Sequence, residues 1–237
     1  MDDDSKKRYK HLFFDLDYTL WDFKSNSLDT LKELYVNFNL KSAGIPEESI
    51  FIERYHFRND ILWDAYRKQE IDRDFLRVNR WIRTLNDFQI SDKVLAYQLS
   101  DAYLKQCALK SKLLPGAFEA LAYLRGKYAL HIITNGFDYV QTKKLKHCGL
   151  DRFFQVVITS DEAGCMKPDR RVFDYALLQT DASADASIYI GDNWDVDIIG
   201  AKNAGLDQVY YNPYRIEHAS IRPTFEIRNL KELINIF

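Results

Sequence analysis

Five short apolar runs, each ending in a polar or glycine-containing turn, constrain the fold of this chain more than any other feature. They cover residues 9–17, 128–136, 155–162, 187–193 and 207–213. Short apolar runs of this kind are typical of strands that are buried on both faces of a parallel sheet. Segments of helical character separate the last four runs, at residues 137–148, 169–179 and 195–204. The alternation of strand and helix predicts a doubly wound, Rossmann-like α/β domain with a mostly parallel sheet.

Residues 24–112 have a different character, because they contain no convincing strand. Apolar residues recur there at steps of three and four, as in Leu28, Leu31 and Leu34, which is the spacing of one buried helix face. Four or more helices are predicted in this region, at residues 28–38, 46–69, 72–88 and 91–107. We therefore expect an all-helical domain inserted just after the first strand.

The predicted domain boundaries follow from this contrast. The α/β core comprises residues 1–22 and 113–237, with further helices at 116–127 and 229–237, and the helical domain comprises residues 23–112. A chain of 237 residues is long enough for a core domain and a smaller second one.

The composition is that of a soluble globular protein, with 46% hydrophobic and 29% charged residues and a formal net charge of −2. So small a net charge gives no general attraction to nucleic acid or anionic lipid, and no apolar run approaches the ~18 residues of a membrane span. The start, MDDDSKKRYK, has no apolar segment of its own, so we expect a cytoplasmic protein without a targeting peptide. The three cysteines are widely separated, which fits reduced thiols better than disulfides or a zinc site.

Two carboxylates, Asp15 and Asp17, end the first apolar run. Residues two apart on a strand point to the same side, and open α/β sheets bind ligands outside the carboxyl ends of their strands. The two like charges repel each other, and a cation bound between them would offset this repulsion. An Asp-x-Asp pair taken alone is more often a solvated acidic turn, so the other strand ends decide between the two interpretations.

The second run ends in Thr134-Asn135-Gly136, where a hydroxyl, an amide and a tight turn could offer hydrogen bonds to a phosphate. Lys167 follows the third run and precedes a helix start at Pro168 and Asp169. Taken singly, the first feature is an ordinary Asn-Gly turn and the second a surface lysine. Their positions at successive strand ends favour a shared site.

The fourth run ends in Gly191-Asp192-Asn193, and Asp195 and Asp197 follow. Helix capping explains acidic residues at such a place, and we accept that explanation for Asp195. Asp192 lies at a strand end like Asp15 and Asp17, and together these residues predict an oxygen-rich site suited to Mg²⁺.

The ordered set resembles the four motifs of the haloacid dehalogenase-like superfamily. The matching positions are Asp15-x-Asp17-x-Thr19, Thr134, Lys167 and Gly191-Asp192-x-x-x-x-Asp197. The resemblance covers the whole chain after the first few residues, and the helical insertion is similar to the superfamily's cap domain.

This resemblance implies a role for each position. Asp15 is the nucleophile that forms an aspartyl-phosphate, and Asp17 is the general acid and then the base. Lys167 and Thr134 stabilise the phosphoryl oxygens. Mg²⁺ is held by Asp15, by Asp192 and by the main-chain carbonyl of Asp17, while Asp197 orders either the water around the metal or Lys167.

Other function classes share parts of this pattern. Superfamily members that cleave carbon–halogen bonds lack an Asp at the position of Asp17, so this residue argues against dehalogenation. Signalling receiver domains share the acidic site but are about half this length and have no helical insertion. A phosphosugar phosphatase or a phosphomutase shares all four motifs and stays open as an alternative.

The helical segment contains Asn59, Trp63 and Tyr66 at steps of four and three, which place one amide and two rings on one helix face. Aromatics at helical spacing more often pack in a helical core. The pattern around them resembles the pyrimidine 5′-nucleotidase branch, although Lys68-Gln69-Glu70 stands where relatives tend to have a glycine. The resemblance implies a small phosphate ester as substrate, a pyrimidine nucleoside monophosphate, bound by these three residues together with Asn135 and Gly136. The oligomeric state stays open.

Overall fold

The computed structural model describes residues 9–218 and 221–237 and divides the chain into two units. The first unit contains the described residues up to Phe23 together with Ser111–Phe237, and the second is Lys24–Lys110. The charged residues 1–8, on which the expectation about targeting rests, lie outside the described part of the chain.

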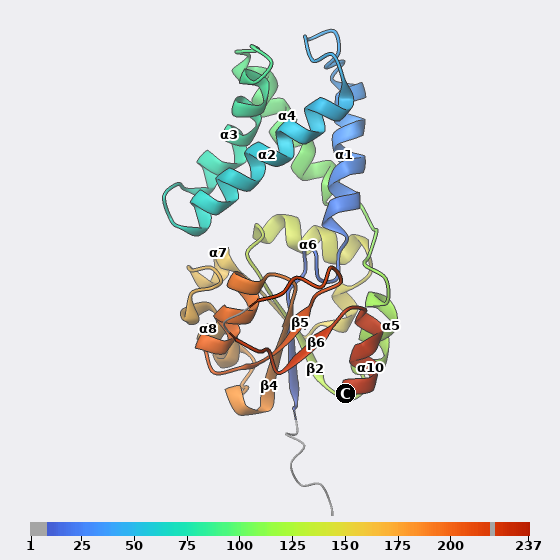
Figure 1. The fold of residues 1–237 in the computed structure, drawn as a ribbon, viewed down its shortest axis with the longest axis vertical. Helices are drawn as coiled ribbons and strands as arrows, with labels where there is room; N and C mark the ends of the chain where they lie inside the picture. Colours follow the sequence, from blue (N-terminus) through green and yellow to red (C-terminus); the bar gives the residue numbers. More distant parts are fainter. Residues whose placement is uncertain (1–8, 219–220) are drawn as a thin grey trace, which may run out of the picture. The chain divides into compact units, whose positions relative to one another are not determined.

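A six-stranded sheet forms the centre of the first unit (Figure 1). Its strand order is β3-β2-β1-β4-β5-β6, and every strand pair is parallel. The strands are β1 His11–Phe14, β2 Ala129–Thr134, β3 Val156–Thr159, β4 Ser187–Gly191, β5 Asp207–Tyr211 and β6 Phe225–Ile227. This order, with β1 in the middle and the chain winding outward in both directions, confirms the predicted doubly wound α/β fold.

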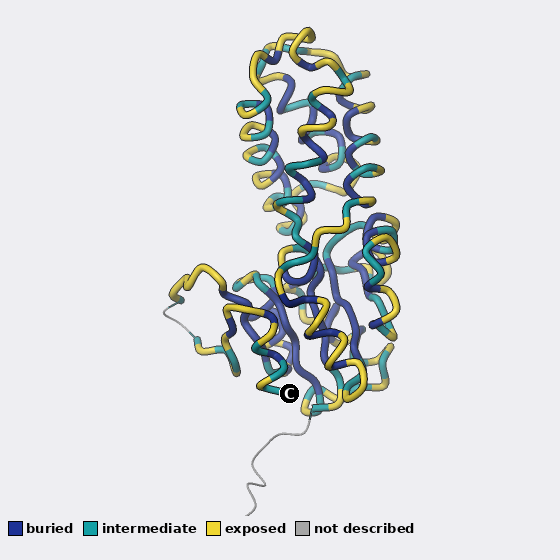
Figure 2. The backbone as a smooth tube through the Cα atoms, turned by 90° about the vertical axis from the view of Figure 1, so that its right-hand side faces the viewer, coloured by how far each residue is buried: buried dark blue, intermediate teal, exposed yellow. Residues whose placement is uncertain are grey.

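Helices cover both faces of this sheet. Helices α8 (Arg170–Gln179) and α9 (Ile199–Asn203) pack with the strands in one buried cluster that includes Phe13, Phe173 and Tyr189. Helices α5 (Ala117–Leu124) and α10 (Leu233–Ile236) contact each other and lie on the opposite side of the strands from α8 (Figure 1). This unit also contains helices α6 Asp138–His147 and α7 Ser160–Ala163. The four inner strands, β2, β1, β4 and β5, are almost wholly buried (Figure 2), as expected for a sheet covered on both faces.

Several details differ from the sequence prediction. Strand β6 was missed because it has only three residues. The single helix expected at 195–204 begins as a π-helical turn, Trp194–Ile198, before α9. The closing helix expected at 229–237 is shorter, with a 3₁₀ turn at Leu230–Glu232 leading into α10.

The second unit contains the predicted helices, and its core is aromatic. They are α1 Phe23–Asn37, α2 Glu48–Arg67, α3 Arg73–Asn86 and α4 Lys93–Cys107. The first residue of α1, Phe23, belongs to the first unit. The ring of Trp81 lies 4.4 Å from that of Tyr55 and 5.5 Å from that of Tyr103, which joins α2, α3 and α4. Buried and exposed positions alternate along these helices, as amphipathic sequences require (Figure 2).

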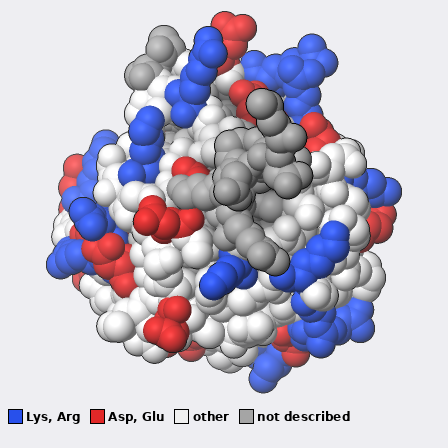
Figure 3. Space-filling model, turned by 90° about the horizontal axis from the view of Figure 1, so that it is seen from below, with Lys and Arg blue, Asp and Glu red and all other residues white. Residues whose placement is uncertain are grey.

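Neither hydropathy nor surface charge distinguishes a particular helix or face among the residues that the structure describes. Among the described residues, no helix combines the length and the apolar character needed to cross a bilayer. Lys, Arg, Asp and Glu side chains are intermixed over the face shown in Figure 3, which fits the net charge of −2.

Candidate active site

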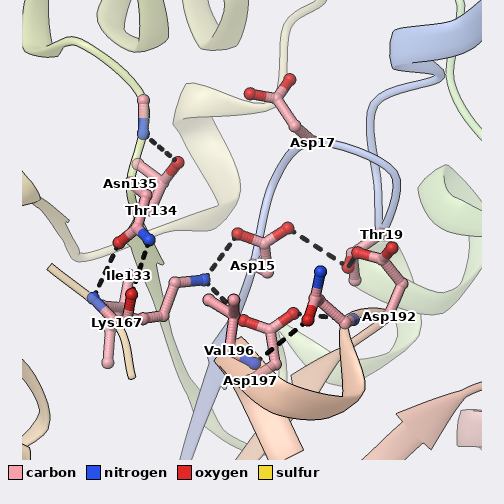
Figure 4. Close-up of polar contacts among 12 residues, drawn as sticks. Asp15, Asp17, Thr19, Ile133, Thr134, Asn135, Lys167, Asp192, Val196 and Asp197 are labelled. Atoms are coloured by element: carbon pink, nitrogen blue, oxygen red, sulfur yellow. Dashed lines mark hydrogen bonds and ion pairs between the residues drawn. The ribbon is translucent and has the colours of Figure 1, made fainter. Parts of the chain in front are cut away.

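Strand ends supply the polar residues of one site in the first unit. Asp15 follows β1, Thr134 ends β2, Lys167 follows the β3 region, and Asp192 follows β4 (Figure 4). Strand β1 pairs with β2 on one side and β4 on the other, so their carboxyl ends lie next to one another at the same edge. The parallel topology therefore brings together residues that lie far apart in the sequence.

Lys167 is a buried lysine with three acceptors. Its Nζ lies 2.7 Å from Asp15 Oδ1, 2.6 Å from the Tyr189 hydroxyl and 2.7 Å from Asp197 Oδ1. Burial disfavours the ammonium charge, but the carboxylates of Asp15 and Asp197 outweigh that effect and raise the pKa of Lys167. The lysine is thus held as a cation beside Asp15, and it is not the surface residue that its motif alone suggests.

Asn135 holds the main chain of Lys167 in place. Its Nδ2 donates to the Lys167 carbonyl at 2.9 Å, and its Oδ1 accepts from the Lys167 N–H at 2.9 Å. The side chain that the sequence predicted as a substrate ligand is therefore engaged with Lys167. Its contact joins the turn after β2 to the segment after β3.

The hydroxyl of Thr134 is oriented by two donors. Its Oγ1 accepts from the Gly136 N–H at 3.1 Å and from Gln141 Nε2 at 2.7 Å. The hydroxyl proton is left to donate elsewhere, which suits a contact with a phosphoryl oxygen. Gly136 is required here, since a Cβ at this position would lie 2.3 Å from Gln141 Nε2.

Carboxylates from three places gather at the sheet edge. Asp15, Asp192 and Asp197 each offer an oxygen, and these oxygens lie within 4.8 Å of one another. Burial, opposed by Lys167 and reinforced by Asp197, raises the pKa of Asp15 to about 7, and burial together with Asp197 and Asp15 holds the pKa of Asp192 well above its usual range. Such crowding is relieved by a divalent cation, and carboxylate oxygens are the ligands that Mg²⁺ prefers.

Asp197 is committed to protein donors. Its Oδ1 accepts from Lys167 and from the Tyr189 hydroxyl at 3.1 Å, and its Oδ2 accepts from the Asn193 N–H at 3.0 Å. Of the two roles that the resemblance implied for Asp197, these contacts support the ordering of Lys167. Gly191 makes the approach possible, because a Cβ there would lie 2.5 Å from Asp197 Cγ.

Asp17 lies apart from the other carboxylates, with its side chain directed away from them (Figure 4). Its Oδ1 is 2.6 Å from Lys144 Nζ and its Oδ2 is 2.9 Å from Gln141 Nε2. The Asp17 side chain is not part of the cluster of oxygens found in the described part of the chain. Any contribution of Asp17 to a metal site would come from its main-chain carbonyl.

Sequence reasoning missed three residues of this site: Tyr189, Gln141 and Lys144. Tyr189 looks like one more aromatic residue in a buried strand, so nothing in its pattern distinguishes it. Gln141 and Lys144 carry a usable signal, because two polar residues three apart share one helix face just after a strand-end motif. Thr19 was noted only as part of a motif, and its Oγ1 donates to Asp192 Oδ1 at 3.0 Å.

In the second unit, the predicted base-binding residues differ in exposure. Asn59 is buried, with its Oδ1 accepting from Arg80 Nη1 at 3.0 Å and its Nδ2 donating to Asp60 Oδ1 at 3.2 Å. Tyr66 lies on the same buried face, and Trp63 beside it is half-buried, with the two rings edge to face at 5.6 Å. The structure thus places the amide inside the helical unit and leaves the Trp63 ring more accessible.

A parallel sheet that gathers a carboxylate, a hydroxyl, a buried lysine and an acidic cluster at successive strand ends defines a hydrolase of the haloacid dehalogenase-like type. The model of the haloacid dehalogenase-like hydrolase family matches residues 9–205, and the chain belongs to this family. The resemblance inferred from the motifs is confirmed.

Relatives extend the likeness over the full chain. The HAD-hydrolase YfnB of Bacillus subtilis is 32% identical over 97% of this chain and 96% of its own, and its crystal structure, bound to magnesium, superposes with a TM-score of 0.87. The pyrimidine 5′-nucleotidase PynA of Streptococcus pneumoniae is 31% identical over 96% of this chain and 94% of its own. The pyrimidine 5′-nucleotidase YjjG of Escherichia coli is 32% identical over 95% and 96%.

Proposed function

We propose that the protein is a Mg²⁺-dependent phosphomonoesterase that works through an aspartyl-phosphate on Asp15 and acts on pyrimidine nucleoside 5′-monophosphates. The observation that supports this most directly is the buried ion pair between Lys167 and Asp15, next to the oriented hydroxyl of Thr134. A nucleophile, a cation and a hydrogen-bond donor are the groups that phosphoryl transfer needs around phosphorus.

The reaction has two steps at Asp15. A carboxylate oxygen of Asp15 attacks phosphorus, the bond from phosphorus to the nucleoside 5′ oxygen breaks, and that oxygen takes a proton from Asp17. Water then attacks the phosphorus of the aspartyl-phosphate, its proton passes to Asp17, and phosphate leaves with the Asp15 carboxylate restored. Asp17 thus acts as acid and then as base.

The surrounding residues stabilise charge during both steps. The Lys167 ammonium lies 2.7 Å from Asp15 Oδ1, where it offsets the charge on a phosphoryl group bound to Asp15. The Thr134 hydroxyl donates to one phosphoryl oxygen. Mg²⁺, held by Asp15, Asp192 and the main-chain carbonyl of Asp17, would supply the remaining charge neutralisation. The oxygen-only donor set fits this ion.

The substrate part of the proposal is supported by the likeness to two pyrimidine 5′-nucleotidases and by the accessible ring of Trp63. A screen of phosphorylated metabolites with phosphate release as the readout tests it. Release from UMP and dTMP in preference to hexose phosphates is the expected result. Release from sugar phosphates alone would favour the phosphosugar phosphatase, and interconversion of phosphosugars without release would favour the mutase.

The mechanism is tested by Asp15→Asn, which keeps the shape of the side chain and removes the nucleophile. Turnover of a generic aryl phosphate should fall to background while the thermal unfolding transition persists. Substantial turnover by this variant would refute the aspartyl-phosphate mechanism.

A further inference from the structure

We infer that Gln141 and Lys144 on α6 are positioning residues that fix the carboxylate of Asp17 for proton transfer to and from the leaving group. The inference rests on the proposed phosphatase function, because it concerns the residue that would protonate the leaving oxygen. Neither residue lies at a strand end, and neither belongs to the motifs by which the site was found. We call these two side chains the α6 clamp.

Both oxygens of Asp17 are held, and each by a different residue of the clamp. Lys144 Nζ lies 2.6 Å from Oδ1, and Gln141 Nε2 donates to Oδ2 at 2.9 Å. Asp17 itself lies in the turn after β1, outside the regular strand, so the main chain alone leaves its side-chain rotamer open. Two contacts from one helix select a single orientation of the carboxylate.

Lys144 is buried in a way that ties it to Asp17. Its side chain is only 4% exposed, and its Nζ lies 4.2 Å from the centre of the Trp21 ring and 5.5 Å from that of Phe23. The rings supply weak cation–π attraction, and Asp17 supplies the opposite charge. A buried ammonium needs an acceptor close by, and Asp17 Oδ1 at 2.6 Å can accept from Lys144 both when Asp17 is ionised and when the proton is on the other oxygen.

Gln141 contacts both the proposed acid/base residue, Asp17, and the proposed phosphoryl-binding residue, Thr134. The same Nε2 that donates to Asp17 also donates to the Thr134 hydroxyl at 2.7 Å. One amide group therefore sets the separation between the acid/base carboxylate and the hydroxyl that would contact the phosphoryl group. The leaving oxygen is one bond from phosphorus, so this separation decides whether Asp17 can reach it.

The clamp predicts a specific kinetic change in Lys144→Met and Gln141→Met. Alcohols are poor leaving groups and need a proton from Asp17, whereas acidic phenols leave without one. We expect kcat/KM for an alkyl phosphate or a nucleotide to fall about 10-fold, and kcat/KM for nitrophenyl phosphate to change less than about 3-fold, since general acids contribute roughly 100-fold or more. The ratio kcat/KM is the right quantity because it covers the steps up to leaving-group release.

The experiment measures kcat/KM over a series of aryl and alkyl phosphates for wild type, Lys144→Met, Gln141→Met and Asp17→Asn, and for each clamp change combined with Asp17→Asn. Lys144→Arg should restore much of the activity towards poor leaving groups, because it keeps a donor for Asp17. Lys146→Met, which removes an exposed lysine of the same helix, is the matched control and should resemble wild type.

The outcomes separate the two proposals. The clamp is supported if both clamp variants depend more steeply on the leaving group than wild type does. In the Asp17→Asn background, the clamp changes should then have no further effect on that dependence. Equal losses on all substrates, or losses that persist unchanged without Asp17, overturn it and leave a structural role. If Lys144→Met does not fold, Gln141→Met carries the test. A wild-type protein that hydrolyses no phosphate ester overturns the proposed function, and the clamp with it.

Discussion

Two glycines allow the polar side chains of the active site to approach as closely as they do. Gly136 gives room to the Gln141 amide, and Gly191 gives room to the Asp197 carboxylate. Both lie at strand ends where a side chain would fill the space that the hydrogen bonds need. Their role is steric, because neither has the positive φ that favours glycine in turns.

Gly191→Ala should damage the site more than the fold. The new Cβ would lie 2.5 Å from Asp197 Cγ, so Asp197 must move away from Lys167. We expect kcat/KM to fall on the order of 100-fold, as when one preorganised charge-stabilising group is lost, with a stability loss of about 1–3 kcal/mol from overpacking. Steady-state kinetics and thermal unfolding measure the two effects.

Gly126→Ala is the control, because a Cβ at this exposed turn would meet no heavy atom within 4 Å. Its activity should equal that of wild type. Full activity in Gly191→Ala would show that Asp197 does not need its present position.

At the scale of elements, the pairing of β1 with β2 brings two histidines together. The rings of His11 and His131 are stacked at 5.4 Å, with His11 Nδ1 3.2 Å from His131 Nε2, and the Phe13 ring lies 4.9 Å from His131. Burial, reinforced by the neighbouring His11, lowers the pKa of His131 to about 4. Burial also lowers the pKa of His11, with a further contribution from Lys10 that Asp181 opposes.

This pair should make the first unit sensitive to acid. The unfolded chain protonates His131 near its ordinary pKa of 6.5, so the unfolded state gains protons first as the pH falls. Stability is therefore retained above pH 6.5 and lost as the pH falls towards 4, by on the order of 2 kcal/mol between pH 7 and pH 5. Unfolding measured by denaturant titration across this range checks the slope.

His131→Leu should flatten that slope, and His147→Gln, which changes an exposed histidine on α6, should leave it as in wild type. An unchanged slope in His131→Leu would assign the acid sensitivity to other groups.

In the helical unit, mutation of Trp63 tests the proposed recognition of the base. Stacking of a base on an aromatic ring contributes roughly 1–3 kcal/mol. Trp63→Ala should therefore raise KM for UMP or dTMP by about one to two decades and affect a small aryl phosphate little. Kinetics on both substrates, together with the melting temperature, check this.

Phe57→Ala is a useful comparison, because Phe57 is an exposed aromatic residue of the same helix. Equal losses on both substrates in Trp63→Ala, with a large drop in melting temperature, would mean that Trp63 acts only in the helical core.

The elements predicted well are those whose signal is local. The run ending at Asp15 and the run ending at Asp192 are strands because apolar, β-rich segments of that length bury well in a parallel sheet. The turn at Trp194–Ile198 was predicted as ordinary helix. Its π-helical geometry accompanies the hydrogen bonds of Asp197, and no local sequence pattern encodes those hydrogen bonds. Tyr189 was missed for the same reason, since its role depends on partners distant in sequence.

At the scale of the whole molecule, carboxylates from residues 15 to 197 meet in one acidic site, so the site is a property of the folded state alone. A cation that binds there binds the folded protein and not the unfolded chain, and it stabilises the fold by mass action. Mg²⁺ bound there would also relieve the repulsion among Asp15, Asp192 and Asp197. Removal of the metal with EDTA should therefore abolish activity and lower stability, and both should return on adding Mg²⁺.

The size of the thermal effect follows from the affinity. A Mg²⁺ concentration of about 100 times the dissociation constant stabilises the folded state by about 2.7 kcal/mol. For a chain of this size, that corresponds to a rise of roughly 5–10 °C in the melting temperature. The rise belongs to the unfolding transition of the α/β unit, and differential scanning calorimetry with and without EDTA measures it.

Asp192→Asn gives this prediction its sharpest form. The variant loses one of the proposed metal ligands, so Mg²⁺ should no longer raise its melting temperature. In EDTA it should be at least as stable as wild type, because one of three crowded carboxylates has become neutral. Asp185→Asn removes an equal charge at an exposed position and should keep the full Mg²⁺ response. A full Mg²⁺ response in Asp192→Asn would place the stabilising ion elsewhere on the molecule and contradict the assignment of the acidic cluster.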